Sequence, residues 1–272
     1  MRHSGRWAGV CVAVMVVLLG VPAWAAEELL PDGFMIRFGG YQIKGANTIM
    51  RLDANNAPVG TYIDFEETLG GETRATLFRL DGLYRFNDRH SLGFSWYDVK
   101  FTGSRDLNID INWGDLPPIT AGSHVDSEIR FNVYKLNYQY SLFHNEKAEL
   151  GASFGLHIMK ISAGISASGI GQSMTEAVTA PLPVFGLYAD YNFTPRFSAF
   201  YNYQFFFINY EDKVRGGLQD FMIGLEYRLF RNVALGAAYN RFGLGADIKG
   251  DNTTLILNTN WNGGLLYGAL YF

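Results

Sequence analysis

From residue 35 onward, apolar and polar side chains alternate with a period of two residues, not with the 3.6-residue period of a helix. The segment 197–207 shows this most plainly, because one of its faces carries only Phe, Tyr and Ala. Its other face carries Ser198, Asn202 and Gln204 together with two phenylalanines. The segments 134–142, 149–158 and 220–229 alternate in the same way. We therefore predict β-strands with one apolar and one polar face.

Soluble β-sandwiches alternate too, so strand length and composition have to decide between the two classes. Each alternating run reaches the roughly 9–11 residues that a tilted strand needs to cross a bilayer. Tyr and Phe crowd the apolar faces toward the strand ends, where membrane barrels place aromatic girdles. Charged residues make up only 18% of the chain, yet its mean hydropathy of +0.00 is too low for a bundle of membrane helices. The pattern predicts an all-β protein, a closed antiparallel up-and-down transmembrane β-barrel.

The connections between the runs give a strand count. Short turns are expected at 87–90, 144–146, 194–195 and 231–232, each entered through a phenylalanine. Longer connections fall around 53–72, 105–125, 166–178, 211–216 and 248–253. Because outer-membrane barrels have short periplasmic turns and long external loops, this arrangement predicts ten strands. The alternative is eight strands with one hairpin outside the wall.

The N-terminus has the layout of an export signal. Arg2 and Arg6 precede an apolar run over 7–20, and Ala23-Trp24-Ala25 supplies the small residues that a signal peptidase recognises. We expect residues 1–25 to be a signal peptide cleaved after Ala25, and residues 26–272 to be a single barrel domain. Export to the bacterial outer membrane follows from this reading.

Cysteine content and charge exclude several classes of function. The one cysteine, Cys11, lies in the expected signal, so the mature chain has no disulfide framework and no thiol chemistry. Loss of Arg2 and Arg6 with the signal changes the net charge from −4 to −6, which argues against a nucleic-acid partner. Phosphate-binding loops, dinucleotide fingerprints and metalloprotease helices are absent from the sequence, and we expect no cofactor.

Taken together, the signal, the aromatic strands and the terminal Leu270-Tyr271-Phe272 resemble small bacterial outer-membrane barrels, the broad OmpA/OmpW-like group. In that group a C-terminal aromatic strand is the recognition signal for the barrel-assembly machinery. The resemblance implies that role for Leu270 and Phe272. It also implies outer-membrane lipids and lipopolysaccharide as partners. Gly264 and Gly268 depart from the pattern, because they occupy the lipid-facing parity of this last strand.

The alternation assigns ten charged side chains to the barrel interior, five basic and five acidic. They are Arg37, Arg79, Asp81, Arg85, Lys135, Glu149, Asp190, Asp220, Glu226 and Arg228. An unpaired charge in a confined interior is costly, and barrels of about eight strands are filled by their own side chains. We therefore expect ion pairs and a largely plugged lumen. The main ion-pair layer is expected near the periplasmic ends, from Arg85, Glu149, Asp190, Glu226 and Arg228.

Candidate catalytic groups in the sequence are weak. The stretch 151–155 matches G-x-S-x-G, but it lies inside an alternating strand and not at the strand-to-helix turn of that motif. His157 is four residues from Ser153, about 13 Å along a strand, so the two cannot bond directly. Omptin-like proteases use acidic residues and a histidine at the barrel mouth. Residues of those types are available in the second long connection, without an omptin-like motif: Asp106, Asp110, Asp115, His124 and Asp126.

Two acidic connections, 53–72 and 105–126, are expected to form a solvated external rim. Asp64, Glu66 and Asp110 are weak candidates for a calcium or magnesium site, because hard cations prefer carboxylate oxygens. The resulting hypothesis is a non-enzymatic outer-membrane barrel with a structural or surface-interaction role and an unidentified external ligand. The alternatives are a narrow channel for ions or small solutes, and a lipid- or peptide-hydrolysing enzyme.

Overall fold

The computed structural model describes residues 33–54, 59–113, 117–167, 172–210, 213–249 and 253–272. The expected signal peptide, with its cleavage after Ala25, lies outside these residues. No helix in the described ranges is both long and apolar enough to cross a membrane. The elements are β1 (Phe34–Ala54), β2 (Ile63–Asp64), α2 (Phe65–Leu69), β3 (Ala75–Arg85), β4 (His90–Asp106), β5 (His124–His144), β6 (Ala148–Ala167), β7 (Gln172–Thr194), β8 (Phe197–Tyr210), β9 (Val214–Phe230), β10 (Val233–Lys249) and β11 (Thr253–Tyr271).

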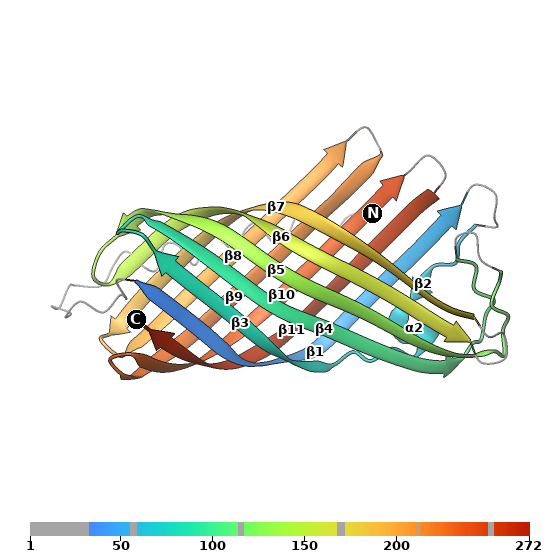
Figure 1. Cartoon of the computed structure of the whole chain (residues 1–272), viewed down its shortest axis with the longest axis horizontal. Helices are drawn as coiled ribbons and strands as arrows, with labels where there is room; N and C mark the ends of the chain where they lie inside the picture. The colour runs from blue at the N-terminus through green and yellow to red at the C-terminus, as the bar shows by residue number, and fades with distance from the viewer. Residues whose placement is uncertain (1–32, 55–58, 114–116, 168–171, 211–212, 250–252) are drawn as a thin grey trace.

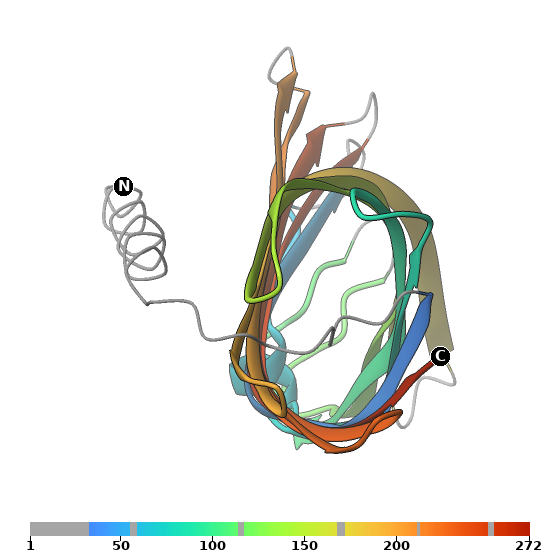
Figure 2. The same cartoon turned by 90° about the vertical axis from the view of Figure 1, so that its left-hand side faces the viewer.

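The strands form one antiparallel sheet of eleven strands that closes on itself. From β3 to β11 each strand pairs with the next, β3 pairs with β1, and β11 returns to pair with β1. The two-residue β2 is attached to β1. Figure 2 looks into the resulting ring, which has an oval outline. The expected all-β, up-and-down antiparallel architecture is confirmed.

The two ends of the ring differ. The connections β3–β4, β5–β6, β7–β8 and β9–β10 are short and lie together with the C-terminus at the left of Figure 1. We call this the turn end and the opposite end the loop end. Since β5 has 21 residues and β6 has 20, these strands are about twice as long as a bilayer crossing requires.

Several long strands change polarity partway along their length, as β5 illustrates. Near the turn end its outward side chains are Tyr134, Leu136 and Tyr138, all exposed, and its inward ones are polar. Nearer the loop end the outward side chains are charged or polar, from Asp126 to Asn132, and the inward ones, Ser127 apart, are apolar. β6, β9, β10 and β11 switch in the same sense. The alternation predicts the apolar band but not this reversal, which becomes visible only when the two halves of each strand are compared separately.

Residues 59–74, between β1 and β3, contain β2 and α2, where the sequence led us to expect a loop without regular structure over 53–72. β3 is shorter than its neighbours, and the segment fills the space beyond it at the loop end: β2 pairs with β1, and Gly71 bridges to Gly103 of β4. Asp64 caps α2 by accepting a hydrogen bond from the Glu67 amide, and Gly70 ends the helix in the left-handed region. Phe65 and Leu69 are buried, so the segment has an apolar anchor that outweighs its acidic composition.

β7 and β8 part before the loop end. Their pairing stops at Phe185 and Phe205, whereas β7 continues along β6 to Gln172 and β8 continues along β9 to Tyr210. Pro181 and Pro183 lie in the unpaired stretch of β7. Proline has no backbone N–H group, and both prolines remain in register with β6. The N–H groups that they lack are therefore missing from the edge of β7 that faces β8. The prolines thus account for the end of the ladder.

The seam between β1 and β11 provides a test of closure. A Cβ atom added at Gly39 would lie 2.1 Å from the Leu266 carbonyl oxygen, while one added at Gly40 would meet nothing within 4 Å. We expect Gly39→Ala to lower the free energy of unfolding by about 1–3 kcal/mol through overpacking. Gly40→Ala, the matched control, should change it by less than about 0.5 kcal/mol. Urea unfolding of the refolded barrel measures both, and equal effects would contradict the close approach at the seam.

Candidate functional site in the barrel interior

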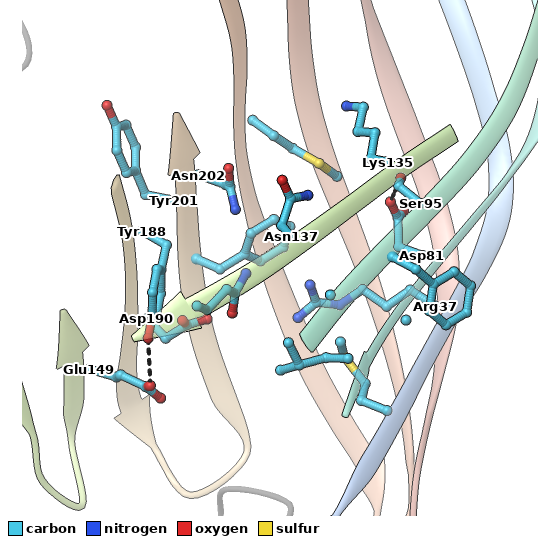
Figure 3. Close-up of a pocket in the computed structure, with 18 of the residues that line it drawn as sticks. Arg37, Asp81, Ser95, Lys135, Asn137, Glu149, Tyr188, Asp190, Tyr201 and Asn202 are labelled. Carbon is cyan, nitrogen blue, oxygen red and sulfur yellow. Dashed lines mark hydrogen bonds between the residues drawn. The ribbon is translucent and has the colours of Figure 1, made fainter. Parts of the chain in front are cut away.

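A cavity of about 180 Å³ occupies the interior near the turn end, lined by side chains from many strands of the ring. Figure 3 shows charged and amide groups converging on it, among them Arg37, Asp81, Lys135 and Asp190. Typical small-molecule sites measure about 300–1,000 Å³. The cavity is therefore polar but small for a ligand of ordinary size.

The layer nearest the turn end contains two arginine–glutamate pairs. Arg85 donates both terminal nitrogens to Glu149, at 2.7 and 3.2 Å, and Arg37 donates to Glu226 at 3.1 Å. Glu149 also accepts from the Tyr188 hydroxyl at 3.1 Å, drawn in Figure 3. Since Glu149 and Glu226 are almost inaccessible, these donors replace the water that the carboxylates lose.

The partners of Glu226 come from the two strands that form the seam, β1 and β11. The sequence placed Glu226 and Arg228 in one ion-pair layer without assigning pairs, and Glu226 is reached by Arg37 and by the hydroxyls of Tyr267 and Tyr271. The Arg228 guanidinium instead lies 4.5 Å from the centre of the Tyr271 ring. Arg228 and Glu226 share one inward face of β9, and closure brings β1, with Arg37, to the same carboxylate. The alternation of residues predicts which face of a strand a side chain occupies, but not which side chain it meets across the barrel interior.

A second charged layer lies closer to the loop end than the first. Lys135 is paired with Asp220, and Arg79 with Asp81 at 3.0 Å. Asn240 joins the two pairs, since its amide nitrogen donates to Asp220 at 2.7 Å and its amide oxygen accepts from Arg79 at 3.3 Å. Asn240 is completely buried, and it was not among the interior residues predicted from the sequence. Its inward parity on β10 was the available signal.

Toward the loop end the interior becomes apolar. The Trp261 ring stacks on Phe242 at 4.2 Å between centroids and contacts Phe131 at 5.3 Å. All three side chains are completely buried. Beyond them the interior holds further buried apolar side chains, which come from the segments β2–α2 and β4–β5 as well as from the strands: Ile63, Phe65, Leu69, Leu107 and Ile111. Tyr97 separates the charged from the apolar layer, with Arg79 and Lys135 within 5.1 Å of its ring centre.

The structure places all the charged residues expected inside, including Arg37, on the interior side of the wall. Glu226 is buried, and the others line the cavity: Arg37, Arg79, Asp81, Arg85, Lys135, Glu149, Asp190, Asp220 and Arg228. Ser153 and His157 also lie inside and are buried, and His157 bonds to Gln204 through Nε2 at 2.8 Å. Neither the aromatic layer nor the apolar anchors of the connections were predicted as features of the interior.

The weak metal candidates have protein partners. Asp64 caps α2, Asp110 accepts a hydrogen bond from the Ala121 amide, and Glu66 accepts one from the Thr48 amide at 3.0 Å. Burial raises the pKa of the Glu66 carboxyl above its usual value, and the Thr48 amide offsets only part of this shift. Within the described ranges, no three metal-ligating side chains of the His, Cys, Asp and Glu types lie close enough to share an ion. Asp115 lies outside those ranges.

Comparisons with known proteins identify the fold. No family model and no curated protein matches the chain. The outer membrane protease OmpT from Escherichia coli superposes with a TM-score of 0.54 at 12% identity, over 89% of this chain and 97% of that one. OprG from Pseudomonas aeruginosa gives 0.36 at 11% identity, over 91% and 100%, and Ail of Yersinia pestis gives 0.34 at 13%, over 88% and 99%. The superposition on OmpT shows that the chain has the fold of a bacterial outer-membrane β-barrel, as its sequence suggested.

The buried pair in the second charged layer provides a test of the interior. Lys135→Met should lower the free energy of unfolding by about 3–5 kcal/mol, because it leaves Asp220 charged and buried without its cation. Adding Asp220→Asn should recover most of that loss. Lys100→Met is the matched control, since Lys100 and Glu128 form an exposed pair whose loss should cost less than about 1 kcal/mol. Urea titration gives all the values, and equal losses at Lys135 and Lys100 would contradict the buried pair.

Proposed function

We propose that the chain is an integral outer-membrane protein whose ten longer strands, β1 and β3 to β11, form the membrane wall. The apolar outward band near the turn end supports this assignment, with Leu266 71%, Phe154 54% and Leu136 52% exposed. A water-soluble monomer rarely exposes so continuous an apolar surface, whereas lipid tails solvate it well. The similar fold of OmpT supports the same placement.

The proposed orientation puts the turn end in the periplasm and the loop end outside the cell, as is general for outer-membrane barrels. The C-terminal strand then presents Leu270 and Phe272 outward, in keeping with the proposed barrel-assembly signal. Phe272 is 68% exposed, and its amide donates to the Phe34 carbonyl at the barrel seam. Outer-membrane lipids and lipopolysaccharide are the partners proposed for the band and for the polar wall above it.

We further propose that the lumen is plugged and that the protein has a structural or surface-interaction role. The observation that carries this proposal is the apolar layer across the interior, in which Phe131, Phe242 and Trp261 are completely buried. Ions cannot shed their hydration water in such a layer without a large free-energy cost. Four ion pairs hold most of the charges in the layers nearer the turn end and so stabilise the barrel without requiring a solute.

Conductance measurements test the plug. The wild-type barrel in planar bilayers should show no steady single-channel steps, whereas Phe131→Ala/Trp261→Ala should open a measurable conductance by removing two rings from the layer. Phe154→Ala/Phe185→Ala is the matched control, because these two rings contact each other on the outward face at 5.4 Å. The control should remain silent. Steady conductance of the wild-type protein would overturn the plugged lumen and favour the narrow channel.

The position of the membrane is tested on one face of β5. Leu136→Lys places a charge in the proposed hydrocarbon region and should cost about 2–4 kcal/mol of unfolding free energy in lipid bilayers. Asn132→Lys lies four residues away on the same outward face, beyond the polarity switch, and should cost less than about 1 kcal/mol. Similar costs at both positions would show that the band is not in lipid.

A further inference from the structure

At the loop end, the outward faces of β4 and β5 bring a serine, a histidine and an aspartate into one hydrogen-bonded chain. His124 Nδ1 lies 2.6 Å from an Asp106 carboxylate oxygen, and His124 Nε2 lies 3.2 Å from the Ser104 hydroxyl oxygen. Strand register produces this contact, since Asp106 is directly opposite His124 and Ser104 is two residues away on the same face of β4. We propose that Ser104, His124 and Asp106 form a hydrolytic triad on the outer surface of the barrel.

The distances in this row of hydrogen bonds accommodate the arrangement of protons that such chemistry requires. An ionised carboxylate only accepts hydrogen bonds, so His124 Nδ1 carries the proton that points at Asp106. In the neutral imidazole the lone pair then lies on Nε2, where it accepts from the Ser104 hydroxyl. Asp126 lies 4.0 Å from the same nitrogen, beyond hydrogen-bond distance, and leaves that position to Ser104. The distances from His124 to Asp106 and to Ser104 are within the hydrogen-bond range expected for a base with its orienting carboxylate and its nucleophile.

The surroundings of Ser104 indicate the substrate class. Ser104 lines a groove whose wall also includes the carboxylates of Glu72, Asp126 and Glu128. Lys100 pairs with Glu128 at 2.7 Å, so Glu72 and Asp126 supply the net negative charge. His124, beside Ser104, is 47% exposed, so the triad is open to molecules in water. The negative potential favours a substrate with a positive charge close to the bond that is cleaved.

The height of the site on the barrel excludes the lipid tails as substrate. Trp96 is the last apolar residue on the outward face of β4, eight residues before Ser104. At roughly 3.3 Å per residue, Ser104 stands about 26 Å further along the strand. This step rests on the proposed membrane position. The triad is therefore assigned to water-soluble cationic esters or amides, not to the acyl chains of bilayer lipids.

The reaction conserves atoms and needs no cofactor. Ser104 Oγ attacks the carbonyl carbon while its proton passes to His124 Nε2, and Asp106 stabilises the imidazolium. The bond from carbon to the alcohol or amine then breaks, and that group leaves with the proton from His124. Water attacks the acyl-serine with His124 again as base, which releases the acid and restores Ser104. This activity goes beyond the proposed structural role and opposes the sequence-based expectation that the chain is not an enzyme.

Active-site labelling tests the triad on the full mature protein folded in detergent. A fluorophosphonate probe should modify Ser104, as peptide mass spectrometry would show, and Ser104→Ala should abolish the labelling. His124→Gln should lower both labelling and the hydrolysis of a lysine p-nitrophenyl ester by about 10²–10⁴-fold through loss of the base. Ser162→Ala is the matched control, because Ser162 lies on the outward face of β6 outside the groove, and it should behave like the wild type.

The outcomes separate the triad from its substrate class. Absence of label on Ser104 in the wild type, or unchanged ester hydrolysis in Ser104→Ala, would overturn the triad. Thermal unfolding of each variant shows whether it is folded, and an exposed substitution at Ser104 should leave the transition unchanged. A norleucine p-nitrophenyl ester, which lacks the side-chain charge, should react more slowly than the lysine ester. Equal rates, or faster release of fatty acid from phospholipid micelles, would overturn the cationic soluble substrate.

Discussion

In lipid there is no water to satisfy a backbone amide or carbonyl, so a spanning sheet has to close on itself. The pairing of β11 with β1 over nearly their whole length meets this constraint. Closure also decides which side chains meet inside. Glu226 finds Arg37 because the first strand returns beside the last, and Asn240 reaches Arg79 for the same reason. The interior network is thus a consequence of ring formation and not of any local motif.

The polarity switch divides the barrel into two bodies with opposite solvation. Near the turn end the wall is apolar outside and charged inside, and near the loop end it is polar outside and apolar inside. The second body has a core of ordinary soluble type, in which Trp261, Phe242 and Phe131 pack together. Burial of aromatic rings stabilises this part by the hydrophobic effect, whereas paired charges and hydrogen bonds fill the first. The same strands run through both bodies and hold them rigidly together.

Local alternation was enough to predict the strands, the short turns and the inward parity of Lys135, Glu149 and Asp220. Those features depend on residues two apart or on a few neighbouring residues, so local sequence patterns are enough to predict them. The partner of Glu226 and the stacking of Trp261 on Phe242 depend on pairing across the ring, which no single strand encodes. The β2–α2 segment was missed because its acidic composition outweighed two signals, the Asp64 cap and the Gly70 stop, that flank buried Phe65 and Leu69. His124 was noticed beside Asp126, but its hydrogen bond to Asp106 requires the register of β4 against β5.

Where β7 diverges from β8, unpaired strand edges are left that could pair with another protein molecule. Two strand margins beyond Phe185 and Phe205 lack a neighbour in the described ladder, and such margins invite a strand from another molecule. Proteins confined to a plane collide often and in similar orientations, so an open margin is a greater hazard there than in free solution. Pro181 and Pro183 remove donors from one of the two margins and so make it a poor template for growth. In the proposed membrane location, these prolines disfavour strand pairing between neighbouring copies along the β7 margin.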